Sequence, residues 1–310
     1  MNRQHGLSLV ELMIASLLGL ILSSAILSTL YAAIAANKLK IAAESIHENS
    51  SLAMYFLAMD LRAIDFSGCL EAGISSANIV STGSIADHLQ RYGVIFAEHK
   101  QYKNSDAFSF VSVLDAGSEL NQSMSSVHSS VDLLADSAVA NTREVLITNC
   151  QVADLFAVSG QWNSQLYHDV PDNSSANLSA AYARGSMLYP LSVVSYKISR
   201  GASGRAGLYR KVNSHYFQEL IPNVEQLRIF YASKQGLDNK IIYRSSSQIN
   251  DYAGVTSIHL QLLLSSPTQV LMHKSYYQNL QGQLVKAADR RLYKSFEITV
   301  ALRNRQLSRE

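Results

Sequence analysis

Proline is scarce in this chain of 310 residues, and the first of its four prolines is Pro171. Proline stops α-helices because it lacks an amide hydrogen and its ring clashes with the preceding turn. Charged residues are also missing from Leu12 to Ala36. An uncharged run of this length without proline is long enough to cross a membrane as one helix.

Neither sign of charge dominates, because 26 Lys and Arg residues are balanced by 24 Asp and Glu residues. A net charge of +2 gives the whole chain no broad field for nucleic acid or for an acidic membrane. The sequence also lacks the phosphate loop, the dinucleotide fingerprint, the nucleophile elbow and the His-Glu-x-x-His motif. We therefore predict a protein that is not an enzyme, with no catalytic residue, metal, cofactor or nucleic acid partner.

Cysteine is limited to Cys69 and Cys150, and neither has a neighbour at the spacing of metal ligands. Both follow the apolar run, whereas Arg3 precedes it. Because basic residues tend to stay on the cytoplasmic side of a membrane segment, the cysteines are expected on the exported side, where disulfides persist. We predict a Cys69–Cys150 disulfide; two separate buried thiols are the alternative.

The apolar run continues into an amphipathic pattern beyond Lys38 and Lys40. Apolar residues recur there at helical spacing, with charged residues between them: Leu39, Ile46, Ala53, Leu57 and Ile64. We predict one helix from about Leu7 to Ile64, on the order of 85 Å long, with Gly68 as its left-handed cap. The head cannot cover a helix of that length, so the inner half needs lipid or the helices of neighbours.

After Cys69 the helical pattern gives way to short runs of β-type composition. The predicted strands are 106–114, 145–147, 155–158, 191–198, 207–212, 224–231, 240–243, 255–264 and 293–302. Short turns between consecutive strands favour antiparallel sheets. Two segments rich in Ser and Asn, 118–141 and 163–179, are predicted loops. The expected fold class is α+β, with a long N-terminal helix packed on a large antiparallel β-rich head.

Gly6 and Glu11 stand directly before the apolar run, behind a short basic stretch. This arrangement resembles the class III leader of type IV prepilins. In that family a membrane peptidase cuts after the Gly, the new N-terminus is methylated, and a Glu occupies the fifth mature position. The resemblance implies cleavage between Gly6 and Leu7, N-methylation of Leu7, and a role for Glu11 in subunit assembly. Leu7 departs from the Phe that usually stands there.

Two simpler export signals explain less of this N-terminus. A secretory signal peptide has an apolar core of about 7–15 residues with a cleavage site behind it, and this run is longer. A plain signal anchor accounts for the run and for Arg3, but not for Glu11. A carboxylate costs on the order of 2.5–3.5 kcal/mol at the centre of a membrane helix, so its presence at the edge of this run indicates a function.

Further stretches resemble the PilW-type minor pilins and are spread over the chain: 56–62 followed by Gly68 and Cys69, then 148–156, 218–227 and 299–305. The domains expected on this basis are a leader at 1–6, a transmembrane and filament-core helix at 7–36, its amphipathic half at 37–66, and a head at 67–310.

The same resemblance implies a low-abundance pilin that helps prime assembly of a type IV pilus, near the pilus tip. The implied partners are the prepilin peptidase, other minor pilins, the major pilin and a large tip-associated adhesin. Before assembly the chain would cross the inner membrane once, with its head in the periplasm. After assembly it would lie on the pilus at the cell surface.

Two alternative functions remain open from the sequence. A J-type minor pseudopilin of a type II secretion system shares the leader, the Glu and a large β-rich head. A pilus-borne adhesin or DNA-binding module would use the head as a receptor. Its candidate DNA surface is a basic and aromatic cluster, for which solvated strand charges are the simpler interpretation: Arg290, Arg291, Tyr293, Lys294, Arg303 and Arg305.

One set of oxygen-bearing residues and one histidine are weighed as metal ligands. Asp169, Asp172 and Asn173 could supply oxygen ligands to Ca²⁺, although a solvated loop is the simpler interpretation. His259 lies in an apolar strand and is interpreted as a satisfied or outward-facing strand residue rather than a ligand.

Overall fold

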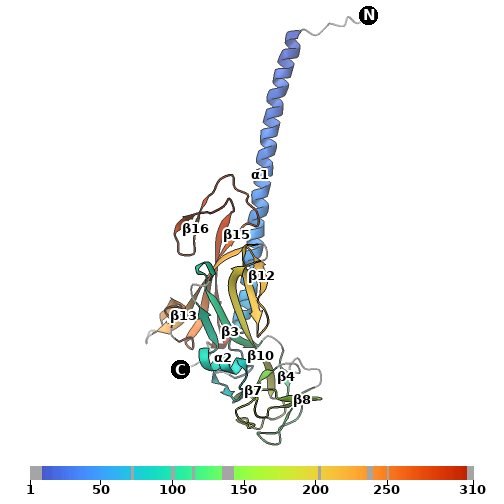
Figure 1. Ribbon diagram of the computed structural model, residues 1–310, viewed down its shortest axis with the longest axis vertical. Helices are drawn as coiled ribbons and strands as arrows, with labels where there is room; N and C mark the ends of the chain where they lie inside the picture. The colour runs from blue at the N-terminus through green and yellow to red at the C-terminus, as the bar shows by residue number, and fades with distance from the viewer. Residues whose placement is uncertain are drawn as a thin grey trace, which may run out of the picture.

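The structure is a computed structural model that describes residues 9–70, 73–98, 102–113, 116–134, 143–201, 204–235, 240–249 and 251–305. One long helix carries a β-rich head on its C-terminal half, and its N-terminal half stands clear of the head (Figure 1). The predicted α+β fold is confirmed.

The long helix, α1, extends from Leu9 to Arg62. Its 54 residues include no proline and one glycine, Gly19, so the sequence offers no strong helix breaker. Among the described residues it is the one helix that is long and apolar enough to cross a membrane. The predicted continuous helix is confirmed from Leu9 onward, and Leu7 lies outside the described residues.

The helix ends at Arg62, where the chain turns to join the head. The next two amides bond to carbonyls three residues earlier, and Ile64 forms a β-bridge with Ser112 in the head. Asp65 then takes a left-handed φ of 61°. Gly68 also has a left-handed φ, of 72°, but it comes after this bridge and this turn. The prediction that Gly68 caps the helix is therefore wrong, because pairing with the head ends the helix first.

The larger of two main sheets follows the order β1-β7-β6-β10-β11-β12, with β2, β3 and β4 joined to it. Its pairs are antiparallel apart from the parallel pair β1–β7. Its strands are β1 Asn78–Ile79, β2 Ile95–Glu98, β3 Ala107–Val113, β4 Ser118–Glu119, β6 Glu144–Thr148, β7 Ala153–Ala157, β10 Met187–Arg200, β11 Ala206–Val212 and β12 Gln218–Pro222.

The smaller main sheet is antiparallel and has the order β14-β13-β15-β18. Its strands are β13 Val224–Gln235, β14 Lys240–Ser245, β15 Val255–Ser265 and β18 Tyr293–Ala301. Two minor sheets contain β5 Val131–Asp132, β8 Gly160–Trp162 and β9 Gln165–Tyr167, and β16 Tyr276–Gln278 and β17 Leu284–Lys286. The remaining elements are helix α2 Ser84–Tyr92 and the short 3₁₀ turns Ile74–Ser76, Tyr102–Asn104 and Arg303–Arg305.

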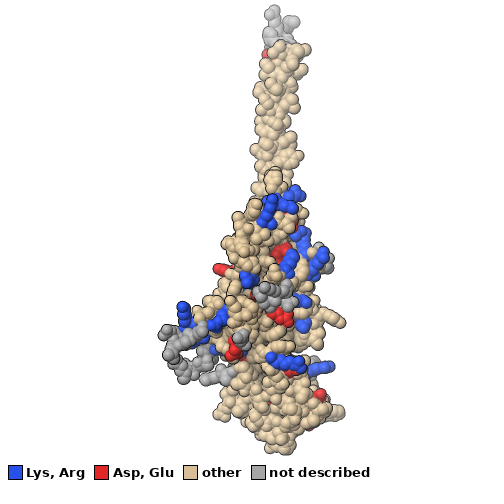
Figure 2. All heavy atoms as spheres, turned by 60° about the vertical axis from the view of Figure 1, so that its left-hand side comes forward, with Lys and Arg blue, Asp and Glu red and all other residues tan. Residues whose placement is uncertain are grey.

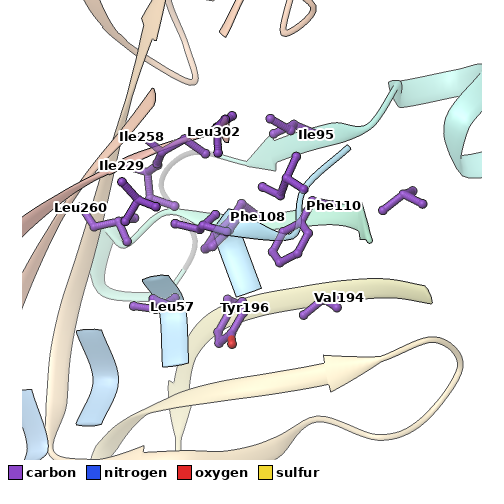
Figure 3. Packing of buried hydrophobic residues seen from close by; sticks show 14 of the residues in the cluster. Leu57, Ile95, Phe108, Phe110, Val194, Tyr196, Ile229, Ile258, Leu260 and Leu302 are labelled. Atoms are coloured by element: carbon purple, nitrogen blue, oxygen red, sulfur yellow. The ribbon is translucent and has the colours of Figure 1, made fainter. Parts of the chain in front are cut away.

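The main hydrophobic core lies between the two sheets and α1. The helix contacts β12, at one edge of the larger sheet, and β15 and β18 of the smaller sheet. Leu57 of α1 lies in this core with Phe108 and Tyr196 of the larger sheet and Leu260 of the smaller one (Figure 3). Truncating a core leucine typically costs about 2–5 kcal/mol, so the C-terminal half of α1 is a fixed part of the head.

A second, smaller core lies in the lobe farthest from the N-terminus of α1, around β4, β7 and β8 (Figure 1). Its members include Leu120, Val145, Phe156 and Tyr182. Strand β10 joins the two lobes, because its first residues pair with β4 and β6 and its later residues pair with β3 and β11. The head predicted as one unit at 67–310 thus contains two hydrophobic cores.

All the predicted strands are present, with ends that differ by up to four residues. The prediction missed β12, helix α2 and the shortest strands. The described parts of 118–141 and 163–179, predicted as loops, contain β4, β5 and β9. Strands of two or three residues are too short to show alternation. Helix α2 depends on a cap from a distant strand, since Glu144 accepts hydrogen bonds from the amides of Ile85 and Ala86.

Candidate functional site

The N-terminal part of α1 is exposed at every position from Leu9 to Ile41. Large apolar side chains dominate this surface, and Leu20 and Tyr31 are each 70% exposed. Hydroxyl groups are satisfied within the helix by bonds to carbonyls three or four residues earlier, at Ser16, Ser23, Ser24, Ser28 and Thr29. Such an extended apolar surface marks a region that lipid or other proteins cover.

Glu11 lies in the first described turn of α1, and its side chain is exposed. A carboxylate is favoured at a helix N-terminus, where the first amides carry partial positive charge. No Lys or Arg stands between Arg3 and Lys38 in the sequence. The predicted cleavage and methylation residues, Gly6 and Leu7, lie outside the described residues.

Asp60 fixes the head-bound half of α1 to the larger sheet. Its buried Oδ2 accepts hydrogen bonds from the Tyr196 hydroxyl at 2.6 Å and from Arg210 Nε at 2.8 Å. Burial and the charge of Asp60 raise the pKa of Tyr196, so the hydroxyl stays a neutral donor. Burial lowers the pKa of Arg210, but its bond to Asp60 outweighs that effect and the pKa is raised. The arrangement is a structural ion pair that joins the helix to β10 and β11.

The C-terminal tail caps the end of α1. Asn304 Nδ2 donates to the carbonyl oxygens of Arg62 at 3.2 Å and Ile64 at 2.9 Å. Carbonyls at a helix end have no partner within the helix, so this side chain replaces the missing bonds. Arg305 Nε lies 2.9 Å from Asp65 Oδ2, and the two side chains are only 6% and 3% exposed. The tail thus holds the turn after α1 by a cap and a buried ion pair.

The carboxylate of Asp65 has further partners. The Ser75 amide donates to Oδ1 at 3.0 Å, and the Ser75 hydroxyl donates to Oδ2 at 3.3 Å. Gly73 has a φ of 73°, and a Cβ there would lie 2.6 Å from Asp65 Cγ, so this position requires glycine. Arg305 also donates to the carbonyl of Tyr252. A buried ion pair is tolerated when extra hydrogen bonds satisfy both charges, as they do here.

The disulfide Cys69–Cys150 adds a covalent connection between the end of α1 and the turn between β6 and β7. The two Cα atoms are 4.9 Å apart. This is the pairing expected from the sequence. Together, the disulfide, Asp60 and Asp65 attach the helix end to three separate parts of the head.

Removal of the disulfide by Cys150→Ser should lower the free energy of unfolding by about 2–4 kcal/mol, because residues 81 apart in sequence are no longer linked in the unfolded chain. Urea unfolding of the full-length chain in detergent, followed by circular dichroism, measures this loss. Alkylation of the denatured, unreduced chain should label neither cysteine. Labelling of both would contradict the disulfide.

Within the described parts of the head, Glu144 and Asp154 are two of the four other carboxylates that are buried. Glu144 binds the first amides of α2 and also accepts from the Ser81 hydroxyl at 2.8 Å. Asp154 accepts from Asn78 Nδ2, the Ser179 hydroxyl and the Tyr182 hydroxyl, each at 2.6 Å. Both carboxylates therefore act as structural acceptors that join loops and strands.

The candidate calcium ligands Asp169, Asp172 and Asn173 are either exposed or bonded to the backbone. Asn173 is buried, and its side-chain amide bonds to both backbone groups of Ala157, at 2.7 and 2.8 Å. Asp169 and Asp172 are exposed. Over the described parts of the chain, no three His, Cys, Asp or Glu side chains group as metal ligands would. His259 Nδ1 lies 2.9 Å from Thr299 Oγ1, consistent with its interpretation as a satisfied strand residue.

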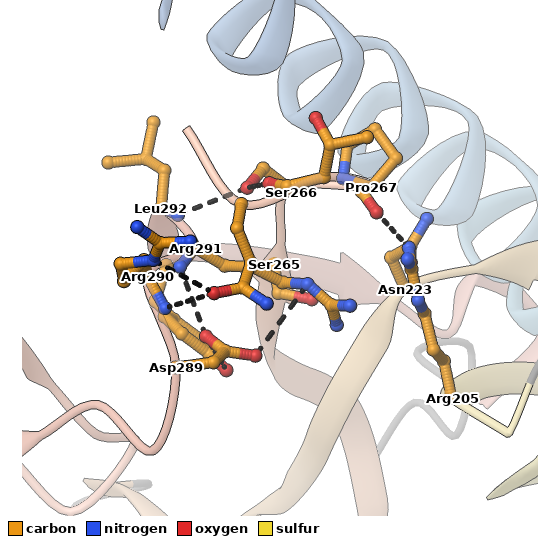
Figure 4. Close-up of polar contacts among 12 residues, drawn as sticks. Arg205, Asn223, Ser265, Ser266, Pro267, Asp289, Arg290, Arg291 and Leu292 are labelled. Carbon is orange, nitrogen blue, oxygen red and sulfur yellow. Dashed lines mark hydrogen bonds and ion pairs between the residues drawn. The ribbon is translucent and has the colours of Figure 1, made fainter. Parts of the chain in front are cut away.

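The basic cluster of the sequence does not form one surface. Arg305 is buried against Asp65, and Arg291 Nε lies 3.6 Å from Asp289 Oδ2. Arg290 Nε bonds to Gln269 at 3.3 Å, close to the Arg291–Asp289 pair (Figure 4). Arg290, Lys294 and Arg303 are exposed, as the interpretation of solvated charges predicts, whereas that interpretation is wrong for Arg305, which is buried in an ion pair.

Comparisons with known families match the two ends of the chain. The prokaryotic N-terminal methylation motif matches residues 1–27, and the PilW family, described as Type IV Pilus-assembly protein W, matches residues 195–304. The second match includes Arg210, which binds Asp60, and Asn304, which caps α1. The methylation motif, the apolar helix and the β-rich head are together typical of type IV pilins. Residues 195–304 are similar to the PilW family, and with the methylation motif this match supports a minor pilin of that type.

Among solved structures, a type IV-like pilin, TTHA1219 from Thermus thermophilus, is similar at 10% sequence identity and a TM-score of 0.36. The similarity covers 84% of this chain and 96% of that chain. No curated protein sequence matches the chain.

Proposed function

We propose that this minor pilin helps prime assembly of a type IV pilus together with other minor pilins, at or near the pilus tip. The main support for this proposal is that the two halves of α1 have different environments. From Ala42 onward the helix is partly buried in the head, whereas positions 9–41 are exposed and mainly apolar. A bundle of parallel helices buries this surface and leaves the heads outside, so the chain is suited to a filament.

The N-terminal segment takes part in each step of the proposed assembly. Prepilin peptidase removes residues 1–6, and Leu7 becomes the methylated N-terminus. The helix holds the subunit in the inner membrane, with the head in the periplasm, until extraction into the filament exchanges lipid for other helices. Glu11 then pairs with the N-terminal ammonium of an adjacent subunit. In a dry bundle such a pair sets axial register more than it adds stability, because desolvation offsets much of the attraction.

The proposed role is structural rather than enzymatic. The J-type pseudopilin remains the closest alternative, but the PilW match over residues 195–304 favours the pilus. A receptor for DNA built on the basic cluster of residues 290–305 is less well supported, because Arg291 and Arg305 are each paired with a carboxylate. The visible far end of the head is mostly uncharged (Figure 2).

Deletion of the gene, scored for surface pili and for exoprotein secretion in the same strain, tests this function. We expect pili to be lost or sharply reduced, secretion to stay unchanged, and the intact gene to restore pili. Loss of secretion with normal piliation would instead support the pseudopilin.

A further inference from the structure

A long hairpin links β15 to β18, and we name its residues 267–291 the flap. Its two arms are joined by backbone hydrogen bonds from base to tip. The pairs are Ser266 with Leu292, Leu271 with Arg290, Ser275 with Ala287, β16 with β17, and Asn279 with Gln283. The flap is therefore an ordered two-stranded projection and not an irregular loop.

The base of the flap is attached to both main sheets. Arg205, from the turn before β11, donates to the carbonyl of Pro267 and to Asn223 Oδ1 at 3.1 Å (Figure 4). The Tyr277 ring stacks on Tyr293 of β18 with ring centroids 4.5 Å apart. These contacts fix where the flap leaves the head.

The flap projects toward the exposed half of α1. At its C-terminal end β18 leads into Asn304, which binds the carbonyl of Arg62 at the end of α1. Earlier in β18, Phe296 stacks on His47, which lies on α1 about four turns before Arg62. The other end of β18, at Tyr293, therefore points toward the N-terminal half of α1. The flap arches from that end alongside the helix (Figure 1).

The surface of the flap combines apolar and basic side chains. Met272, Leu284 and Tyr276 are 81%, 72% and 61% exposed. Three cationic residues are also exposed: Lys274, Lys286 and Arg290. Asp289 is the one acidic residue in the flap sequence, and it pairs with Arg291. The near-neutral charge of the whole chain thus hides a local basic surplus.

Two more cations, Lys38 and Lys40, lie on α1 where the apolar run ends. Figure 2 shows Lys and Arg side chains gathered around this part of the molecule. If α1 crosses a bilayer, these groups and the flap share the side of the head that faces the membrane surface. Basic side chains beside a membrane segment are attracted to anionic lipid headgroups, and exposed Met, Leu and Tyr insert at the interface.

We propose that the flap docks on the anionic phospholipid headgroups of the leaflet beneath the head while the subunit is stored in the membrane. Docking adds a second membrane contact to α1 and fixes the tilt of the head before extraction. The inference rests on the proposed function, because it requires α1 to cross the membrane. It goes further by assigning a lipid contact to the head itself.

The single tryptophan of the chain allows a direct test. Trp162 is 71% exposed on β8, in the lobe farthest from the flap. The variant Trp162→Phe with Met272→Trp moves this fluorophore to an exposed flap position. Both full-length proteins are placed in nanodiscs of phosphatidylcholine with phosphatidylglycerol, a fraction of the lipid carrying a nitroxide at the headgroup. We expect strong quenching of the tryptophan at position 272 and little quenching of Trp162.

The contribution of basic charge to docking is tested in the Trp162→Phe, Met272→Trp variant. Lys274→Gln, Lys286→Gln and Arg290→Gln are added to it together. Each basic residue near an anionic surface strengthens binding about fivefold, so their combined loss should weaken docking on the order of a hundredfold and remove the quenching. Nanodiscs of phosphatidylcholine alone, or high salt, should have the same effect. The three positions are exposed, so folding should be unaffected.

Equally weak quenching of the tryptophans at positions 272 and 162 in anionic discs would show that the flap does not touch the membrane. That result would overturn the proposal. Quenching of equal strength in phosphatidylcholine discs would exclude anionic headgroups as the partner. Protection of position 272 only when another minor pilin is added would assign the flap to a protein interface instead. The proposed function is tested separately. Normal piliation of the deletion strain, or failure of the chain to enter nanodiscs at all, would count against it.

Discussion

Replacement of Glu11 by Leu should reduce or abolish piliation, while protein level and membrane fraction stay normal. A carboxylate is costly in lipid, so Glu11→Leu should insert into the membrane as well as the original chain or better. In the filament, the N-terminal ammonium of the adjacent subunit would lose its partner. A charge left unpaired in a low-dielectric bundle is strongly unfavourable.

Glu11→Asp is the matched control, because it keeps the charge and shortens the side chain by one methylene. We expect it to restore part of the piliation. The measurement is a count of surface pili by electron microscopy at native expression, with the membrane fraction probed in parallel. Because few copies of a minor pilin are needed, the defect should be milder than for the same change in a major pilin. Wild-type piliation by Glu11→Leu would exclude the pairing mechanism.

Replacement of Arg305 by Leu should lower the free energy of unfolding by about 3–5 kcal/mol, the usual cost of breaking a buried ion pair by removing one partner. The Asp65 carboxylate, only 3% exposed, would remain buried without its cation. It adjoins the turn that ends α1, so the loss should also loosen the attachment of the helix to the head. Thermal or urea unfolding of the full-length chain in detergent measures the change.

Arg303 provides a matched control, since it lies on the same 3₁₀ turn and its side chain is exposed. Arg303→Leu should change stability by less than about 0.5 kcal/mol. Adding Asp65→Asn to Arg305→Leu should recover part of the loss, because the uncompensated charge disappears and Asn tolerates the left-handed backbone at that position. Equal stabilities of Arg303→Leu and Arg305→Leu would show that the ion pair does not hold the junction.

The long helix and the long strands could be predicted because their signals are local and continuous. Positions 12–36 carry no charge, and no proline precedes Pro171, so one uninterrupted helix followed from composition alone. Strand β15 contains the apolar run 262–264, and β18 alternates polar with apolar residues over much of its length, so both are visible in the sequence. By contrast, α2 has nine residues and its cap comes from Glu144, more than fifty residues later.

The junction between α1 and the head could not be derived from the sequence, because its partners are far apart along the chain. Asp60 binds Arg210, and Asp65 binds Arg305, across 150 and 240 residues. The tail 299–305 resembles that of a known family, but only the structure shows its physical role as the cap of α1. The same tail limits the interpretation of the basic cluster as solvated charges, since Arg305 is buried rather than exposed.

Mass spectrometry of the chain recovered from sheared, purified pili tests most directly whether this protein is a processed filament subunit. We predict that it is present in small amounts and that its first residue is N-methylated Leu7, with residues 1–6 removed. Recovery of the chain from assembled pili with Met1 intact would contradict its assignment as a prepilin.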